Sequence, residues 1–180
     1  MDKLERITLG AGCFWCIEAV FKRMNGVVDV CSGFSGGHVI NPSYKEVCRQ
    51  TTGHAEVIQL SFDPKIISVQ EILEVFWSIH DPTTLNRQGN DIGTHYRSAV
   101  FYHNENQRLI AEEYKLQLDQ SGVFKNSIVT EITEWQNFYP AENYHSDYFD
   151  LNGEEPYCRF VIRPKVEKFE KTYAEKLRKK

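Results

Sequence analysis

Two cysteines in Cys13-Phe14-Trp15-Cys16 stand between a short β-like run, residues 6–9, and the first helical pattern. At the head of a helix, unpaired backbone N–H groups and the positive end of the helix dipole favour a thiolate, the form of cysteine that attacks electrophiles. The spacing therefore predicts a nucleophilic thiol with a lowered pKa. The alternative is that both cysteines are small buried hydrophobes, since free cysteine is among the most buried residue types. These residues alone favour neither reading.

A carboxyl group supplies the second candidate. Residues 54–62 alternate as a strand does, and Glu56 falls on the same face as Ile58, Leu60 and Phe62. Desolvation on a core-facing side raises the pKa of a carboxyl group, so Glu56 would stay protonated, as a general acid must. The alternative is an ion pair at the strand end that only fixes structure.

Hydrophobic periodicity and caps predict the elements that position these side chains. A helix from Phe14 ends near Gly26, and a strand over 27–32 follows. Capping boxes at Ser43 and Ser68 open a short helix that carries Tyr44 and a longer helix through residue 79. The remaining expectations are a strand over 96–102, a helix over 104–120, a strand over 128–133 and a last helix from residue 164.

Two segments lack this regularity. Residues 81–95 contain Pro82, Gly89 and Gly93 without periodicity, which predicts a long ordered or functional loop. Residues 135–149 are rich in aromatic side chains, most of which we expect to pack against the core.

The order strand, helix, strand, then strand, helix, strand is the split βαβ pattern of a ferredoxin-like α+β fold. We expect a two-layer sandwich with a mixed sheet and both long helices on one face. A length of 180 residues favours a single catalytic domain, 1–180, with residues 150–180 as a C-terminal extension wrapped on it or trailing from it.

The amino-acid composition limits the class of protein to which this chain can belong. The net charge is −4, so no global field attracts nucleic acid or an anionic membrane, and the lysines near the C-terminus are expected to form a solvated helix face. The sequence has no apolar run of about 18 residues, and its first five residues are too polar for us to expect a signal peptide there. We expect a cytoplasmic monomer whose five cysteines are thiols, so any disulfide would be transient and catalytic.

Four motifs resemble the signatures of the A-type peptide methionine sulfoxide reductases, in the order and near the spacing of that family. They are Gly12–Trp15, Asn41–Tyr44, Thr52–Glu56 and Asn86–Ser98. Any one of them is weak, but together they are specific. The resemblance implies repair of oxidative damage by reduction of the S epimer of methionine sulfoxide, free or in proteins, with thioredoxin as reductant and no metal or organic cofactor.

The resemblance also implies roles for single residues. Cys13 would be the nucleophile and Glu56 the proton donor, while Tyr44 and Tyr96 would hydrogen-bond the sulfoxide oxygen. Phe14 and Trp15 would form the pocket for the substrate methyl group, and Asp91 would orient the substrate or organise the site. A sulfoxide sulfur is a poor electrophile until its oxygen is protonated, so a thiolate, an acid and hydroxyl donors belong together.

Reduction would leave Cys13 as a sulfenic acid, which a second thiol condenses into a disulfide. Cys16 is one helical turn away, where the family more often has Gly. Cys158, in Pro156-Tyr157-Cys158, resembles the C-terminal Tyr-Cys motif of the family. We favour Cys16 as the resolving thiol and keep Cys158 as the alternative.

Two other functions were weighed. A thioredoxin-like disulfide oxidoreductase would use Cys13 and Cys16 alone and would leave Tyr44, Glu56 and Tyr96 without a role. A zinc-binding module would need a second ligand pair at short spacing, and Cys31, Cys48 and Cys158 are isolated in sequence.

Overall fold

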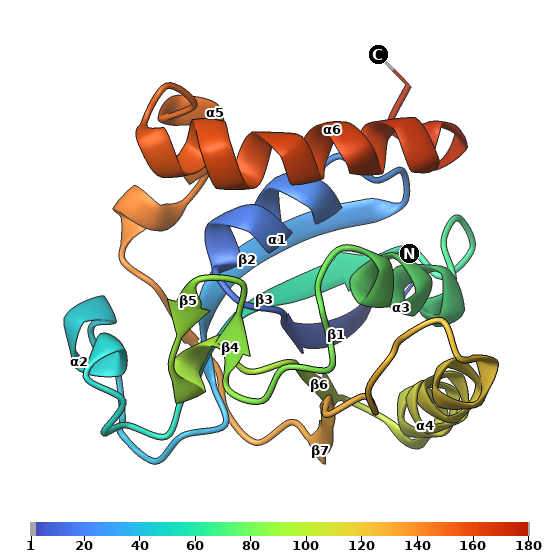
Figure 1. Ribbon diagram of the computed structural model, residues 1–180, viewed down its shortest axis with the longest axis horizontal. Helices are drawn as coiled ribbons and strands as arrows, with labels where there is room; N and C mark the ends of the chain where they lie inside the picture. The colour runs from blue at the N-terminus through green and yellow to red at the C-terminus, as the bar shows by residue number, and fades with distance from the viewer. Residues whose placement is uncertain (1–2, 180) are drawn as a thin grey trace.

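A six-stranded sheet forms the centre of the computed structural model, which describes residues 3–179 (Figure 1). The strands of this sheet are β1 (Glu5–Gly10), β2 (Val27–Ser35), β3 (Ala55–Phe62), β6 (Ala99–Tyr102), β7 (Glu131–Glu134) and β8 (Tyr139–Pro140). They lie in the order β7-β6-β1-β3-β2-β8, and only β6 and β7 run parallel. The four central strands thus have the arrangement of a split βαβ fold, and the expected α+β class with a mixed sheet is confirmed.

The helices are α1 (Phe14–Phe21), α2 (Tyr44–Cys48), α3 (Val69–Ser78), α4 (Glu105–Ser121), α5 (Tyr148–Leu151) and α6 (Arg163–Thr172). Short 3-10 turns are η1 (Thr94–Tyr96), η2 (Asn143–His145) and η4 (Ala174–Lys176), and the π-helical turn η3 (Cys158–Ile162) leads into α6. Both predicted capping boxes form in full, so α2 and α3 begin where the sequence places them.

The predicted loop over 81–95 is not wholly irregular. It contains a small hairpin, β4 (Arg87–Gln88) and β5 (Asp91–Ile92), separate from the main sheet. Gly89 has φ +58° at the turn, a conformation that favours glycine and closes the hairpin. The prediction missed it because two-residue strands show no alternation.

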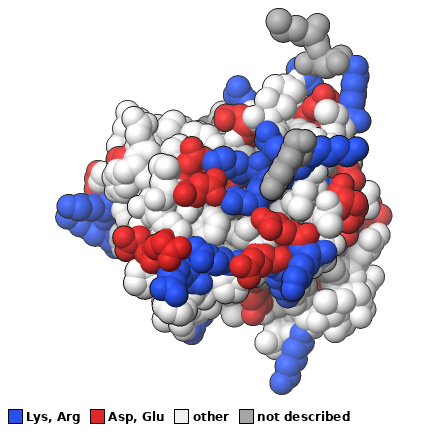
Figure 2. All heavy atoms as spheres, turned by 90° about the horizontal axis from the view of Figure 1, so that it is seen from above, with Lys and Arg blue, Asp and Glu red and all other residues white. Residues whose placement is uncertain are grey.

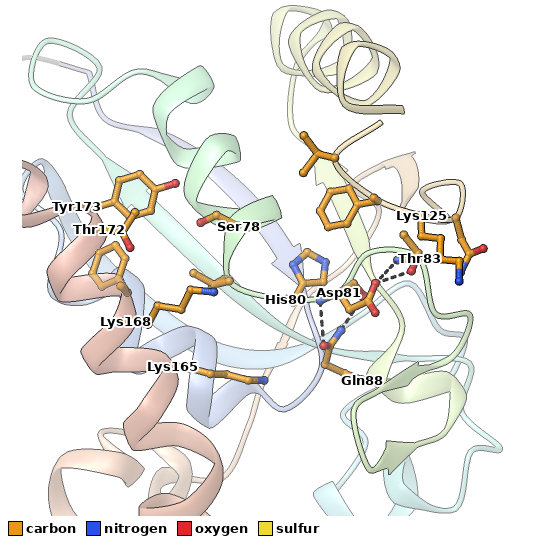
Figure 3. A pocket seen from close by; sticks show the side chains of 15 residues that line it. Ser78, His80, Asp81, Thr83, Gln88, Lys125, Lys165, Lys168, Thr172 and Tyr173 are labelled. Atoms are coloured by element: carbon orange, nitrogen blue, oxygen red, sulfur yellow. Dashed lines mark hydrogen bonds between the residues drawn. The ribbon is translucent and has the colours of Figure 1, made fainter. Parts of the chain in front are cut away.

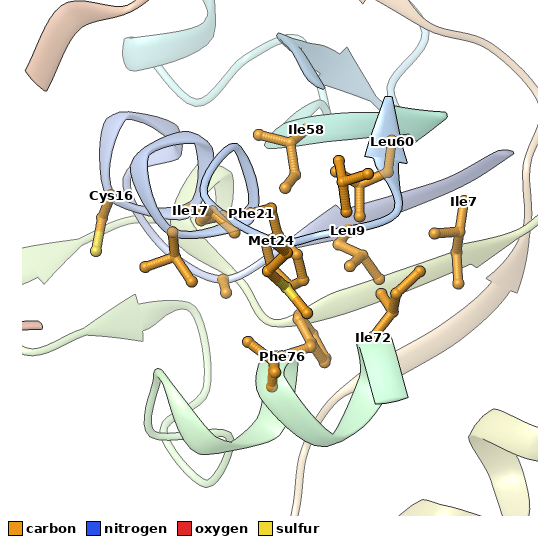
Figure 4. Packing of buried hydrophobic residues seen from close by; sticks show 14 of the residues in the cluster. Ile7, Leu9, Cys16, Ile17, Phe21, Met24, Ile58, Leu60, Ile72 and Phe76 are labelled. Carbon is orange, nitrogen blue, oxygen red and sulfur yellow. The ribbon is translucent and has the colours of Figure 1, made fainter. Parts of the chain in front are cut away.

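The main core lies between the sheet and the two helices α1 and α3 (Figure 4). Ile7 and Leu9 of β1 face Ile58 and Leu60 of β3 across the antiparallel register, and all four are fully buried. Both long helices of the split βαβ unit therefore cover the same face, as expected. This packing fixes α1, and with it Cys13, over the start of β3.

The C-terminal segment returns to α1. Helix α6 lies above α1 in Figure 1, and the residues that follow it are tied to the α1–β2 turn: Asn25 N–H donates to Lys176 O at 2.8 Å and Arg178 N–H to Arg23 O at 2.9 Å. Ion pairs join Lys22 to Asp150 and Arg23 to Glu170. Figure 2 shows both signs of charge interspersed on this side.

Candidate functional site

Cys13 is the N-cap residue of α1 and lies at the end of the turn that follows β1. Gly12 before it has φ +85°, and a Cβ there would lie 2.8 Å from the Gln88 side chain. Glycine is therefore required both by the backbone conformation and by the close approach of β4. The Cys13 side chain is 7% exposed.

The electrostatics of Cys13 differ from the expectation of a lowered thiol pKa. Burial and the nearby Glu56 carboxyl raise the pKa of Cys13 well above its ordinary value. Hydrogen bonds from the Trp15 backbone N–H and the Tyr157 hydroxyl act in the opposite direction. The helix head supplies the predicted stabilisation of a thiolate, but desolvation exceeds it in the free protein.

Glu56 lies on β3 opposite Phe34 of β2 and is fully buried on the core face, as its position in the strand predicts. Neither carboxyl oxygen has a hydrogen-bond partner among residues 3–179. Burial and the charge of Asp91 raise the pKa of Glu56 well above its usual value. The Phe14 backbone N–H lies near the carboxyl group and lowers this pKa in part, but it does not meet the geometry of a hydrogen bond. A protonated, unpartnered carboxyl group is the form that can donate to an incoming oxygen.

Tyr44 and Tyr96 reach the same place from α2 and η1. Burial and the nearby Glu56 raise the pKa of both phenols, so both remain hydrogen-bond donors. Cys48 also lies near both tyrosines, since a charge on its sulfur would raise the pKa of each phenol. Cys48 is isolated from the other cysteines in the sequence, and the structure places it beside the site.

Asp91 of β5 is joined to a residue that sequence reasoning did not select. The Tyr157 hydroxyl donates to Asp91 Oδ2 at 2.5 Å and lies within hydrogen-bonding range of the Cys13 sulfur. Asp91 also raises the pKa values of Glu56 and Cys16. The hairpin and the C-terminal segment thus meet at Cys13.

Phe14 and Trp15 lie in a cluster of rings. Trp15 stacks on Tyr148 with ring centroids 3.8 Å apart, and its indole N–H donates to His145 Nδ1 at 3.0 Å. His145 is fully buried and also contacts Phe14 and Tyr44, with centroids 5.1 and 4.5 Å away. The dense aromatic segment 135–149 was expected mostly to pack on the core, but two of its rings build a wall of the site.

The two remaining candidate thiols lie in different surroundings. The Cys16 backbone N–H donates to Cys13 O at 3.2 Å, one helical turn along α1. Burial raises the pKa of the Cys16 thiol, and the Lys165 ammonium lowers it in part. Cys158 begins η3 and is fully buried.

Residues 3–179 contain no group of three or more His, Cys, Asp or Glu side chains placed to hold a metal ion. Within the same residues, no helix is both long and apolar enough to cross a membrane.

A family profile described as peptide methionine sulfoxide reductase matches residues 5–177. The chain belongs to this family. It is 56% identical to the peptide methionine sulfoxide reductase MsrA of Saccharolobus solfataricus over 97% of this chain and 98% of the relative. For MsrA of Sulfolobus acidocaldarius the identity is 54%, over 96% and 97%.

Solved structures show the same likeness to the peptide methionine sulfoxide reductases. The reduced form of Mxr1 from Saccharomyces cerevisiae superposes with a TM-score of 0.79 at 38% identity, covering 87% of this chain and 90% of that one. Mxr1 in complex with Trx2 has a TM-score of 0.56 at 28% identity, covering 81% and 85%. The chain is accordingly a peptide methionine sulfoxide reductase of the A type, and neither the thioredoxin-like nor the zinc-binding alternative describes it.

Proposed function

We propose that this reductase converts the S epimer of methionine sulfoxide, free or in proteins, to methionine through a sulfenic acid on Cys13 and an intramolecular disulfide. The observation that carries the proposal is the buried, unpartnered carboxyl group of Glu56 beside the Cys13 thiol. A carboxyl group buried without partners makes no hydrogen bonds until a substrate oxygen arrives, so it is free to donate to that oxygen.

In the first step the sulfoxide oxygen takes a proton from Glu56 and accepts hydrogen bonds from Tyr44 and Tyr96. This makes the sulfoxide sulfur electrophilic, and the Cys13 sulfur attacks it. The bond formed between the two sulfurs then breaks as the oxygen passes to Cys13, which becomes a sulfenic acid, and the bond of the oxygen to the methionine sulfur breaks. The proton of the Cys13 thiol replaces the one that Glu56 gave. Two electrons pass from Cys13 to the substrate, which leaves as methionine.

Substrate position depends on the aromatic wall. Phe14 and Trp15 exclude water and hold the methyl group, and the Trp15 ring is itself fixed by Tyr148 and His145. Asp91 acts with Tyr157, since their hydrogen bond places the phenol beside the Cys13 sulfur. We assign Tyr157 the role of stabilising negative charge on that sulfur.

We assign resolution to Cys16. Its thiolate attacks the Cys13 sulfur, the S–S bond forms, the S–O bond breaks, and the hydroxide takes up a proton and leaves as water. Its place one turn from Cys13 and the nearby Lys165 ammonium support this role. A thioredoxin dithiol would return both cysteines to thiols by two exchanges and become a disulfide itself, so the cycle needs no metal or organic cofactor.

The test is a single turnover without reductant, followed by peptide mass mapping. We expect one methionine per enzyme and a Cys13–Cys16 linkage, no methionine from Cys13→Ser, and an accumulated sulfenic acid in Cys16→Ser. Cys31→Ser is the matched control and should behave as wild type. A Cys13–Cys158 linkage would transfer the resolving role to Cys158, whereas methionine formation by Cys13→Ser would contradict the mechanism.

A further inference from the structure

A cleft of about 660 Å³ lies between α6 and the loop that follows α4 (Figure 3), and none of the proposed catalytic residues lines it. The end of α3 and the residues just after it form its floor. This volume falls in the range of pockets that hold small organic ligands.

Three lysines, Lys125, Lys165 and Lys168, line the cleft, and none of them has a hydrogen bond or an ion pair within residues 3–179. In Figure 3 the side chains of Lys165 and Lys168 extend from α6 into the cleft. Asp81 is the one carboxylate among the described lining residues, and its Oδ1 already accepts from Thr83 N–H at 3.0 Å and Thr83 Oγ1 at 2.5 Å. The cleft therefore has an excess of positive charge.

The floor needs no hydrogen bonds from a ligand. His80 is buried, with Nδ1 bonded to Phe76 O at 2.6 Å and Nε2 to Ser98 Oγ at 2.8 Å. Gln88 is bonded to the Asp81 backbone in both directions, at 3.0 and 2.9 Å. The side chains of the floor are thus already hydrogen-bonded, and the lysines are the groups that would bind the charge of a ligand.

The walls are amphipathic. Phe169 and Ile79 present apolar surface, and Tyr173 and Thr172 add hydroxyl groups beside the lysines. An inorganic ion would leave most of this volume unfilled, whereas an anion attached to an apolar body would contact walls and lysines together.

We propose that the cleft binds a small organic anion, a carboxylate or a phosphate ester on an apolar body, with its charged group between Lys165 and Lys168.

Calorimetric titration at fixed ionic strength tests the binding with phenyl phosphate, 3-phenylpropionate, inorganic phosphate and benzyl alcohol. Both organic anions should bind saturably, more tightly than inorganic phosphate, and benzyl alcohol should not bind. The double variant Lys165→Gln, Lys168→Gln should bind the organic anions about tenfold more weakly, while Lys171→Gln on the exposed side of α6 stays within twofold. Absence of saturable binding, or equal affinity in the double variant, overturns the proposal.

Discussion

Two buried polar clusters in this protein differ in how many of their side-chain polar atoms have hydrogen-bond partners. Behind the cleft, His80, Ser98, Thr130 and Trp77 form a chain of bonds: Ser98 Oγ lies 2.8 Å from His80 Nε2 and 2.7 Å from Thr130 Oγ1, which accepts from Trp77 Nε1 at 3.0 Å. At the thiol site, both oxygens of Glu56 lack partners. The first cluster is complete in the folded chain, and the second is completed by a substrate.

The presence or absence of hydrogen-bond partners distinguishes the structural polar residues from the catalytic ones more clearly than burial does. All of these groups are nearly or fully buried. An unmade hydrogen bond in the interior costs about 1–3 kcal/mol, so a fold keeps one where chemistry requires it. Variants of the two clusters should accordingly separate activity from stability.

The largest effect is expected for Glu56→Gln. The amide cannot transfer a proton, so the rate of sulfenic acid formation should fall by about 10²–10⁴ while Cys13 remains titratable. Stopped-flow measurement of the first turnover checks this, with Glu134→Gln on the exposed strand β7 as control. A wild-type rate in Glu56→Gln would end the general-acid assignment.

Thr130→Val tests the complete cluster. Loss of the hydroxyl leaves Trp77 Nε1 without its acceptor and Ser98 Oγ with its bond to His80 alone, so the free energy of unfolding should fall by about 1–3 kcal/mol. The kcat should be unchanged. Urea denaturation measures the first and a steady-state assay the second. Thr133→Val, at an exposed position of the adjoining strand β7, should change stability by less than about 0.5 kcal/mol.

The pH dependence of stability offers a separate measurement on Glu56. Its pKa is raised in the folded chain, so above the unfolded value, near 4.5, the native state keeps a proton that the unfolded state releases. Stability then falls as pH rises toward the raised pKa, by about 1.4 kcal/mol per pH unit at most. Glu56→Gln lacks this loss, so its stability relative to wild type should increase between pH 5 and pH 8. A difference independent of pH would mean that Glu56 is ionised in the native protein.

His145→Leu should have the smallest effect. The Trp15 indole loses its acceptor, so the wall of the methyl pocket becomes less fixed. We expect about a tenfold rise in KM and weaker discrimination between methyl and ethyl sulfoxides, with little change in the rate of the chemical step. His38→Leu, at an exposed histidine, is the control. An unaltered methyl preference would show that Tyr148 alone holds Trp15.

Local signals in the sequence predicted much of this fold because they act over a few residues. The capping boxes at Ser43 and Ser68 close over three residues, and the alternation around Glu56 places its side chain on the core face. The signatures for Cys13, Tyr44 and Tyr96 lie at the ends of such elements, and the fold brings them together.

The parts that were missed depend on contacts distant in sequence. The bond from Tyr157 to Asp91 spans 66 residues, and that from Trp15 to His145 spans 130. Residue spacing in the sequence does not predict contacts between residues so far apart. The pKa of Cys13 was predicted with the wrong direction for the same reason, because the helix head is local while the burial that outweighs it comes from distant segments.

The segment that follows α6 is hydrogen-bonded to the α1–β2 turn, so residues that are synthesised at different times lie side by side in the fold. Cys13 leaves the ribosome well before His145, Tyr148 and Tyr157. At bacterial or eukaryotic synthesis speeds the interval is on the order of ten seconds. The nascent chain thus carries its thiol before it has the aromatic wall that selects a substrate, and selectivity begins only when these later residues have been made.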